Sequence, residues 1–298
     1  MGNGAAHRRR DWGRLLPDID TGTVAEDDGP PFQSRWQRHW LTIKDWILFV
    51  IGGGLIVWGI VLGASGMGYN WQWYRVPRYL WRVVDGEVIW GPLMRGLFVT
   101  IDITLWAALV SFTLGLVVAL MRLSRSYAGH AIATAYLEIV RNTPLLVQMY
   151  LFYFVLSPIL GIDRFWTGVL AVSVFEASFI SEIIRSGILS VERGQWEGAA
   201  ALGLRLRQIY PKIVLPQAMP LMAPPMTSAL VNLIKNSAIV STIAIFDLTN
   251  EGRNVIADTF MSFEIWFTVA AIYLIMTISL SAVAARLEAR ARRGMSRA

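Results

Sequence analysis

Residues 46–64 read WILFVIGGGLIVWGIVLGA, a run without a single charged side chain. A helix rises about 1.5 Å per residue, so this run is long enough to cross a hydrocarbon core of about 30 Å. The whole chain points the same way, because 55% of its 298 residues are hydrophobic and only 16% are charged. Ordinary soluble domains carry about 25% charged residues. The composition therefore excludes a soluble enzyme or a disordered protein and predicts an all-α integral membrane protein.

Further apolar runs of about 20 residues follow the first one, and each is long enough to span a bilayer. The runs cover residues 96–121, 130–157, 166–188, 214–240 and 264–285. The sequence thus predicts about six transmembrane helices. Several prolines, Pro216, Pro220, Pro224 and Pro225, are expected to break up the fifth of them.

The basic residues indicate which side of the membrane each loop faces. An even number of spans places both termini on one side, and most of the 27 lysines and arginines fall on that side of the predicted topology. The positive-inside rule then makes the N- and C-termini cytoplasmic. Three arginines between Arg75 and Arg82 lie outside among tryptophans and tyrosines, and this stretch is interpreted as an interfacial aromatic segment.

The net charge of +6 reflects this topology and does not indicate nucleic-acid binding. Cysteine is absent from the sequence, which excludes disulfides and thiolate chemistry. None of the three lysines follows a glycine, so a GxxxxGK[ST] phosphate loop is absent as well. We therefore expect no metal and no cofactor, and any nucleotide chemistry must belong to another chain.

The longest inner loop, residues 190–216, reads SVERGQWEGAAALGLRLRQIYPKIVLP. Glu197 is followed by a run of small residues, then by Gly203, and after nine more residues by Ile213, Leu215 and Pro216. This spacing resembles the EAA loop of the permease subunits of bacterial ABC importers. Gly198 stands where that family usually has its first alanine, which is a departure that conserves size.

The physics of this loop agrees with what the resemblance implies, a short helix that docks on a cytoplasmic ATPase. Small side chains let two backbones approach closely, and Glu197 lies near the positive end of a helix expected from Gln195 to Leu202. Gly203 can adopt the left-handed conformation that reverses the chain. The expected ATPase-coupling residues are Gln195, Glu197, Ala199, Ala200 and Gly203.

Other segments extend the resemblance over roughly residues 92–290. EIVRNTPLLVQMYLFYFVL (138–156), SEIIRSGILSVERGQWEGAAALG (181–203) and IVLPQAMPLMAPPMTSALVNLIKNSAIVS (213–241) look like the polar amino acid branch of these permeases, the histidine, glutamate, glutamine, arginine and opine group. The resemblance implies a type I ABC importer fold in a bacterial inner membrane. It also implies partners: a cytoplasmic ABC ATPase, a second permease subunit that is a copy or a paralogue, a periplasmic amino-acid-binding protein and membrane lipid, but no nucleic acid.

The chain is expected to divide into four parts. Residues 1–45 form a polar cytoplasmic tail, partly disordered and unlike a signal peptide because the apolar run begins too late. Residues 46–91 add a first transmembrane helix and the outer aromatic segment, which the minimal five-span relatives lack. Residues 92–290 form the importer domain, with its coupling loop at 190–216, and residues 291–298 are a basic cytoplasmic end.

Polar residues at membrane depth are expensive and often mark a transport path. The expected substrate-pathway residues are Asn142, Thr143, Glu176, Asn232, Lys235, Asn236 and Ser237. For several of them a structural role stands beside the functional one: Asn142 and Thr143 can hold the kink at Pro144, and Lys235 can reach the headgroups. Glu182 and Arg185 are expected to form an inner gate or a packing pair.

The sequence thus predicts a permease subunit, itself no enzyme, that imports glutamate-like, aspartate-like or glutamine-like amino acids by alternating access. Two alternatives stand beside it. A membrane scaffold that only docks an ATPase would keep the coupling loop without needing the polar stripe around Lys235. An intramembrane serine hydrolase is suggested by Gly63-Ala64-Ser65-Gly66, but the three histidines lie on the inner side of the predicted topology and Ser65 on the outer side.

Overall fold

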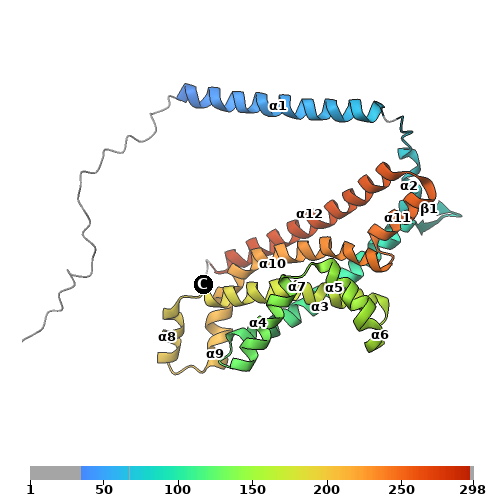
Figure 1. Ribbon diagram of the computed structural model, residues 1–298. Coiled ribbons are helices and arrows are strands. Elements are labelled where there is room, and N and C mark those ends of the chain that lie inside the picture. Colours follow the sequence, from blue (N-terminus) through green and yellow to red (C-terminus); the bar gives the residue numbers. More distant parts are fainter. Residues whose placement is uncertain (1–34, 67, 296–298) are drawn as a thin grey trace, which may run out of the picture. The chain divides into compact units, whose positions relative to one another are not determined.

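The computed structural model describes residues 35–66 and 68–295 (Figure 1). Most of the predicted polar tail and the last three residues of the predicted basic end lie outside this range. The chain divides into two compact units, Met1–Asn70 and Trp71–Ala298. The aromatic segment that follows Asn70 therefore belongs to the same unit as the importer domain.

The described part of the first unit contains a single long helix, α1 (Arg35–Gly66). Its stretch Lys44–Gly63 is long and apolar enough to cross a membrane, in agreement with the predicted first span. The large apolar side chains of this stretch are exposed, with Trp46 64%, Leu48 67% and Phe49 72% accessible. Such a helix is stable only where lipid or protein surrounds it.

The described part of the second unit is helical except for one hairpin. Its elements are η2 (Trp73–Arg75), α2 (Pro77–Leu80), β1 (Trp81–Val84), β2 (Glu87–Trp90), α3 (Pro92–Leu123), α4 (Tyr127–Arg141), α5 (Leu145–Leu151), η3 (Phe152–Leu156), α6 (Ser157–Leu160), α7 (Arg164–Leu189), α8 (Arg193–Ala201), α9 (Leu206–Ile209), η4 (Tyr210–Val214), α10 (Leu215–Ser237), η5 (Ala238–Ile243), α11 (Leu248–Thr259) and α12 (Ser262–Met295). Figure 1 shows the long helices side by side, with α8 at one end and the hairpin at the other.

The described residues contain four helices that meet the length and hydropathy of a span, or six if two bent pairs are each counted as one. The third predicted span, 130–157, is not a single straight helix. It is bent by 107° between α4 and the α5–α6 segment. Pro144 stands at the start of α5, where its missing N–H and its effect on the preceding residue both end the helix before it.

The prolines of the fifth predicted span do not interrupt it, contrary to the expectation. Helix α10 is continuous through Pro220, Pro224 and Pro225. Each proline removes its own N–H donor and crowds the preceding turn, and the packing of α10 against α3, α7 and α12 supports the helix through these positions. The irregular stretch lies just before α10, in the π-helical turn η4.

Helices α3 and α7 form the centre of the second unit by close packing of small residues. The buried face of α3 contains Thr100, Ala107, Ser111, Gly115 and Ala119, spaced by one or two turns. A Cβ added at Gly115 would lie 2.8 Å from Ile180 Cγ2 and 3.1 Å from the carbonyl oxygen of Ala177 on α7. Small residues permit this approach between membrane helices.

We expect Gly115→Val to destabilise the protein by about 1–3 kcal/mol, because the added methyl groups overpack the contact between α3 and α7. The measurement is the thermal unfolding midpoint of the purified protein in detergent. Gly59→Val in α1 is the matched control, because a Cβ at Gly59 meets nothing within 4 Å. Equal midpoints for the two variants would contradict the packing described here.

The hairpin was not predicted, although its signals are in the sequence. Strands β1 and β2 pair antiparallel around Asp85-Gly86, whose φ values are 53° and 83°. Positive φ at both central residues is typical of a type I′ turn, and an Asp-Gly pair between apolar strands predicts one. The predicted interfacial aromatic segment is therefore in part a small sheet, while the second unit remains otherwise helical.

Candidate functional site

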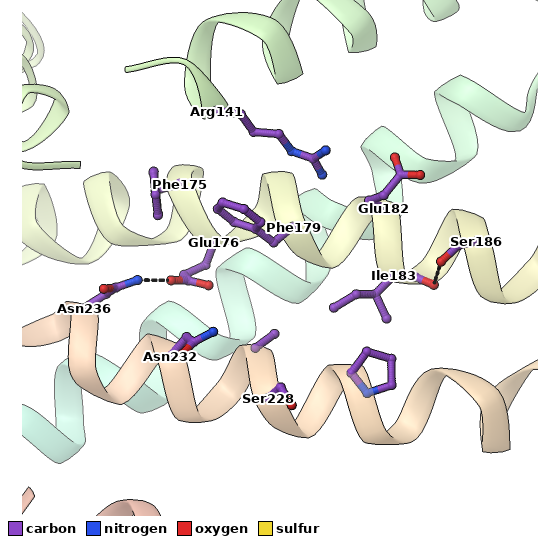
Figure 2. Close-up of a pocket in the computed structure, with 12 residues that line it drawn as sticks. Arg141, Phe175, Glu176, Phe179, Glu182, Ile183, Ser186, Ser228, Asn232 and Asn236 are labelled. Atoms are coloured by element: carbon purple, nitrogen blue, oxygen red, sulfur yellow. Dashed lines mark hydrogen bonds between the residues drawn. The ribbon is translucent and has the colours of Figure 1, made fainter. Parts of the chain in front are cut away.

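A cavity of about 510 Å³ lies between α7 and α10, with the end of α4 beside it (Figure 2). This volume falls within the range of about 300–1,000 Å³ that small-molecule sites occupy. The lining residues are Arg141, Phe175, Glu176, Phe179, Glu182, Ile183, Ser186, Pro225, Ser228, Ala229, Asn232 and Asn236. Two phenylalanines and a set of polar side chains thus face one space at membrane depth.

Glu176 is the most deeply buried polar residue of the cavity wall, with 2% of its surface exposed. Asn236 Nδ2 on α10 donates a hydrogen bond to Glu176 Oε1 at 2.6 Å, which Figure 2 shows as a bridge between the two helices. Within the described residues, none of the ion pairs includes Glu176. A buried carboxylate in this position is suited to bind a cation or an ammonium group that enters the cavity.

Arg141 brings a positive charge to the same cavity, and the sequence reasoning missed this role. Arg141 follows Glu138 at the spacing of a helical ion pair, but Arg141 Nη2 donates to the carbonyl oxygen of Ser178, and its guanidinium lies 5.3 Å from the ring centre of Phe179. Glu138 instead accepts a hydrogen bond from Asn142 Nδ2 at 3.0 Å. Helix α4 packs directly against α7, and this tertiary contact, which sequence spacing alone does not show, brings Arg141 beside Phe179.

The polar stripe predicted on α10 only partly faces the cavity. Ser228, Asn232 and Asn236 line it, since they follow one another at intervals of one helical turn. Lys235 is exposed and is not among the lining residues. The hydroxyl of Ser237 is buried and donates to the carbonyl oxygen of Ile234 at 2.7 Å.

Asn142 and Thr143 lie at the break between α4 and α5 and are not among the residues that line the cavity. Asn142 Nδ2 donates to the carbonyl oxygen of Glu138 at 2.7 Å, and the Thr143 hydroxyl donates to that of Ile139 at 2.9 Å. Gln148 Nε2 in turn donates to Thr143 Oγ1 at 2.7 Å. The Thr143 bond thus satisfies the Ile139 carbonyl, which the end of α4 leaves open, and Gln148 Nε2 also donates to the open carbonyl oxygen of Val140 at 2.7 Å.

Glu182 and Arg185 form an ion pair of 2.6 Å on α7, and Arg122 from the end of α3 joins them. Their side chains are between 20% and 33% exposed. One carboxylate thus holds two guanidinium groups, and Glu182 also faces the cavity. The ion pairs therefore link the cavity wall on α7 to the C-terminal end of α3.

We expect Glu182→Gln to weaken this cluster, because an amide retains the shape of the side chain but not the charge that both arginines contact. A hydrogen bond to a charged group contributes about 1.5–3 kcal/mol. If the cluster only packs the helices, the unfolding midpoint falls and the coupling of ATP hydrolysis to uptake is unchanged. If it is a gate, ATP hydrolysis without cargo rises while the midpoint changes little. An unchanged midpoint together with unchanged hydrolysis would exclude both roles.

The predicted coupling loop contains helix α8, which begins at Arg193 and ends at Ala201, two residues earlier at its start than expected. Gly203 follows with φ of 77°, so the expected left-handed reversal is present. Glu197 is 68% exposed and pairs with Arg193 at 3.1 Å. Gln195 is also exposed and accepts a hydrogen bond from Gln217 Nε2 at 3.3 Å.

The small residues of α8 differ in how far they are buried. Ala199 is buried, in a cluster that includes Ile209 and Val214, whereas Ala200 is exposed. The sequence reasoning missed two apolar side chains beside Gly203, Leu202 and Leu206, which are 82% and 65% exposed. Leu202 directly follows α8 and Leu206 begins α9, so two exposed apolar side chains flank the turn at Gly203.

The described residues contain no group of three or more His, Asp or Glu side chains placed to hold a metal ion. The side chains of Ser65 and His39, and the whole of His7, lie outside the described residues, so the structure does not describe the hydrolase alternative at those positions.

A set of apolar helices long enough to span a membrane, with a polar cavity between two of them, is typical of a membrane transport protein. Residues 111–293 match the family described as "Binding-protein-dependent transport system inner membrane component". The chain belongs to this family, and its several apolar helices make it a multi-pass inner membrane protein.

The chain is similar in sequence to several amino acid permeases. The chain is 38% identical over 189 residues to the probable glutamine ABC transporter permease protein GlnM of Bacillus subtilis strain 168, covering 63% of this chain and 88% of that protein. It is 33% identical over 213 residues to the glutamine transport system permease protein GlnP of Escherichia coli strain K12, covering 69% and 97%. It is also 33% identical over 198 residues to the arginine transport system permease protein ArtQ of Bacillus subtilis strain 168, covering 66% and 90%.

Solved structures agree with the fold. A crystal structure of an amino acid ABC transporter with histidines is 34% identical, with a TM-score of 0.62 over 67% of this chain and 94% of that one. The inward-facing MetNI methionine ABC transporter has a TM-score of 0.60 over 67% and 96%, and at 22% identity it supports the fold alone. These findings confirm the predicted permease family and its all-helical type I importer fold.

Proposed function

We propose that this chain is the permease subunit of an ATP-driven importer of polar amino acids and that it works by alternating access. The observation that carries the proposal is the cavity between α7 and α10, where Glu176 and Asn236 meet at membrane depth. A scaffold that only docked an ATPase would not need a buried carboxylate there, since such a group is costly unless it is used.

The cavity chemistry suits a zwitterion. Glu176 is placed to bind an ammonium group, and Arg141 brings a guanidinium that suits a carboxylate. Ser228 and Asn232 add hydrogen-bonding side chains without charge. The names of the relatives, which are glutamine and arginine permeases, support the same class of cargo.

The remaining pathway residues are proposed to support the path without lining the cavity. Asn142 and Thr143 hold the bend that follows Arg141. Ser237 fixes the end of α10 beyond Asn236, and the exposed Lys235 lies next to the polar face of that helix. Glu182 with Arg185 is proposed as the gate on the α8 side of the cavity.

ATP hydrolysis is assigned to a separate cytoplasmic ABC ATPase that docks on α8. The exposed side chains of Gln195, Glu197 and Ala200, with Leu202 and Leu206 beside Gly203, form the proposed contact. We propose that α8 and both termini lie on the cytoplasmic side, which the distribution of basic residues supports.

A second permease subunit, a copy or a paralogue, is proposed to cover the open side of the cavity. Arg141, Ser228 and Asn232 line the cavity yet are exposed. Polar side chains at membrane depth normally face protein or a water-filled space, so lipid is a poor neighbour for them. A periplasmic amino-acid-binding protein is proposed to deliver the cargo at the end opposite α8.

The test is to purify the chain gently from its native membrane, to identify the proteins that come with it, and to reconstitute the complex in liposomes. We expect an ABC ATPase and a binding protein, and ATP-dependent uptake of labelled glutamine, glutamate, aspartate or arginine. The purified chain alone should hydrolyse no ATP. A complex that contains the ATPase but imports none of these amino acids would contradict the proposed transport function.

A further inference from the structure

The hairpin of β1 and β2 has one face that is entirely apolar. Side chains directly opposite each other in an antiparallel pair lie on the same face. The register pairs Trp81 with Trp90 and Val83 with Val88, so these four residues form the apolar face. Their exposed fractions are 48%, 47%, 66% and 56% in the order Trp81, Trp90, Val83, Val88.

The opposite face carries both charged side chains of the strands, Arg82 and Glu87, beside two apolar ones. The register pairs Arg82 with Ile89 and Val84 with Glu87, and we call these four residues the charged face. The turn at Asp85 adds a further charge at the tip. The hairpin is therefore amphipathic across its thickness, which a strand buried on both sides would not be.

The base of the hairpin is fixed next to the membrane-spanning helix α3. The N–H of Gly91 donates to the carbonyl oxygen of Leu80 at 2.8 Å. A Cβ at Gly91 would lie 2.3 Å from the carbonyl oxygen of Tyr79, so only glycine fits this close approach. Tyr79 and Leu80 in turn pack on the buried cluster that includes Leu93.

The apolar face continues onto the outer surface of α3. The ring of Trp90 packs edge-on against Phe98, with their centres 5.7 Å apart. Phe98 is 45% exposed on the span Pro92–Leu123, and Ile101 and Leu105 further along that span are 38% and 65% exposed. Lipid is the expected neighbour for such a surface, and the hairpin lies at the level where that surface begins.

We propose that this hairpin is a membrane-interface anchor. Its apolar face lies against the boundary between headgroups and acyl chains, and its charged face points to headgroups and water. Tryptophan collects at this boundary because its ring is apolar and its N–H is polar. The match to the family model begins at residue 111, after this element.

Two physical limits fix the depth of the hairpin. An isolated two-stranded hairpin is marginally stable in water, so the apolar face gains from contact with lipid. Each strand also has an edge that no other strand among residues 35–66 and 68–295 pairs with, because the sheet described there has two strands. Unpaired backbone groups are costly in hydrocarbon, which keeps the hairpin at the interface and out of the core.

The cysteine-free sequence allows a direct test by single-cysteine labelling. Val83→Cys and Val88→Cys place a label on the apolar face, and Arg82→Cys and Glu87→Cys place one on the charged face. Each full-length variant carries an environment-sensitive fluorophore and is reconstituted in vesicles of phosphatidylcholine and phosphatidylglycerol. Quenching is measured with nitroxide on the lipid acyl chain and, separately, with iodide in the water.

We expect the labels at 83 and 88 to lose most of their emission to the lipid nitroxide and little to iodide, and the labels at 82 and 87 to show the reverse. Gel filtration and the unfolding midpoint show that each variant is folded. Equal access of iodide to both faces would overturn the proposal. Protection of the apolar face only after a binding protein is added would also overturn it. So would cross-linking between two Val83→Cys chains, because in either case a protein would cover this face.

Discussion

Glu176→Gln is expected to lower amino acid uptake by about 10- to 100-fold while the protein still folds and assembles. The glutamine side chain keeps the volume of Glu176 and can still accept the hydrogen bond from Asn236. It removes the negative charge that an ammonium group would meet in the cavity. A hydrogen bond to a charged group contributes about 1.5–3 kcal/mol, and each 1.4 kcal/mol corresponds to about a factor of ten.

The measurement is initial uptake into proteoliposomes at several cargo concentrations, together with ATP hydrolysis in the presence of the binding protein. Glu138→Gln is the matched control, since Glu138 is exposed on α4 and does not line the cavity. If both variants transport equally well, Glu176 is a structural residue and the cavity is not the cargo site.

Gly203→Val is expected to uncouple ATP hydrolysis from uptake. The φ of 77° at Gly203 is a left-handed conformation, and a residue with a Cβ occupies it at a cost of about 1–2 kcal/mol, with more for a β-branched side chain. A Cβ at Gly203 meets nothing within 4 Å, so the effect comes from the backbone and not from a clash. The turn that positions α8 would shift, and we expect uptake per ATP hydrolysed to fall at least about tenfold.

Gly198→Ala is the control for this second prediction. Gly198 lies inside α8, its Cβ position is open, and alanine restores the residue that the family usually has there. Uptake and hydrolysis are measured on the same liposomes. Normal coupling in the Gly203→Val transporter would show that the reversal after α8 does not transmit motion between the ATPase and the membrane helices.

The sequence predicted the spans well because hydropathy and length are properties of each segment by itself. It predicted the bend at Pro144 less well. A proline marks where a helix is weakened, but the 107° angle depends on how α5 packs against α7, which is information from outside the segment. The hairpin was missed for a different reason. Its apolar and aromatic residues are typical both of a membrane-surface segment and of a short strand pair, so composition alone does not distinguish the two.

For the candidate site, too, the sequence predicted the properties of single residues better than their contacts. Glu176, Asn232 and Asn236 were expected from their cost at membrane depth, and all three line the cavity. Arg141 lines the cavity although it was not among the expected pathway residues, and Lys235 was expected there but does not line the cavity. The reason is that tertiary packing decides which face a helix turns to its neighbour. Spacing along a helix shows which residues share a face, but it does not show what that face meets.

The close contact between α3 and α7 at Gly115 has a mechanical consequence. Two helices whose backbones touch through a glycine cannot slide or tilt against each other without a clash, so this pair acts as a fixed frame. A transport cycle must then proceed by displacement of other elements against the frame, and α10 across the cavity is the nearest candidate. Spin labels on α3 and α7 should keep one separation through the ATP cycle, while a label on α10 changes its distance to both.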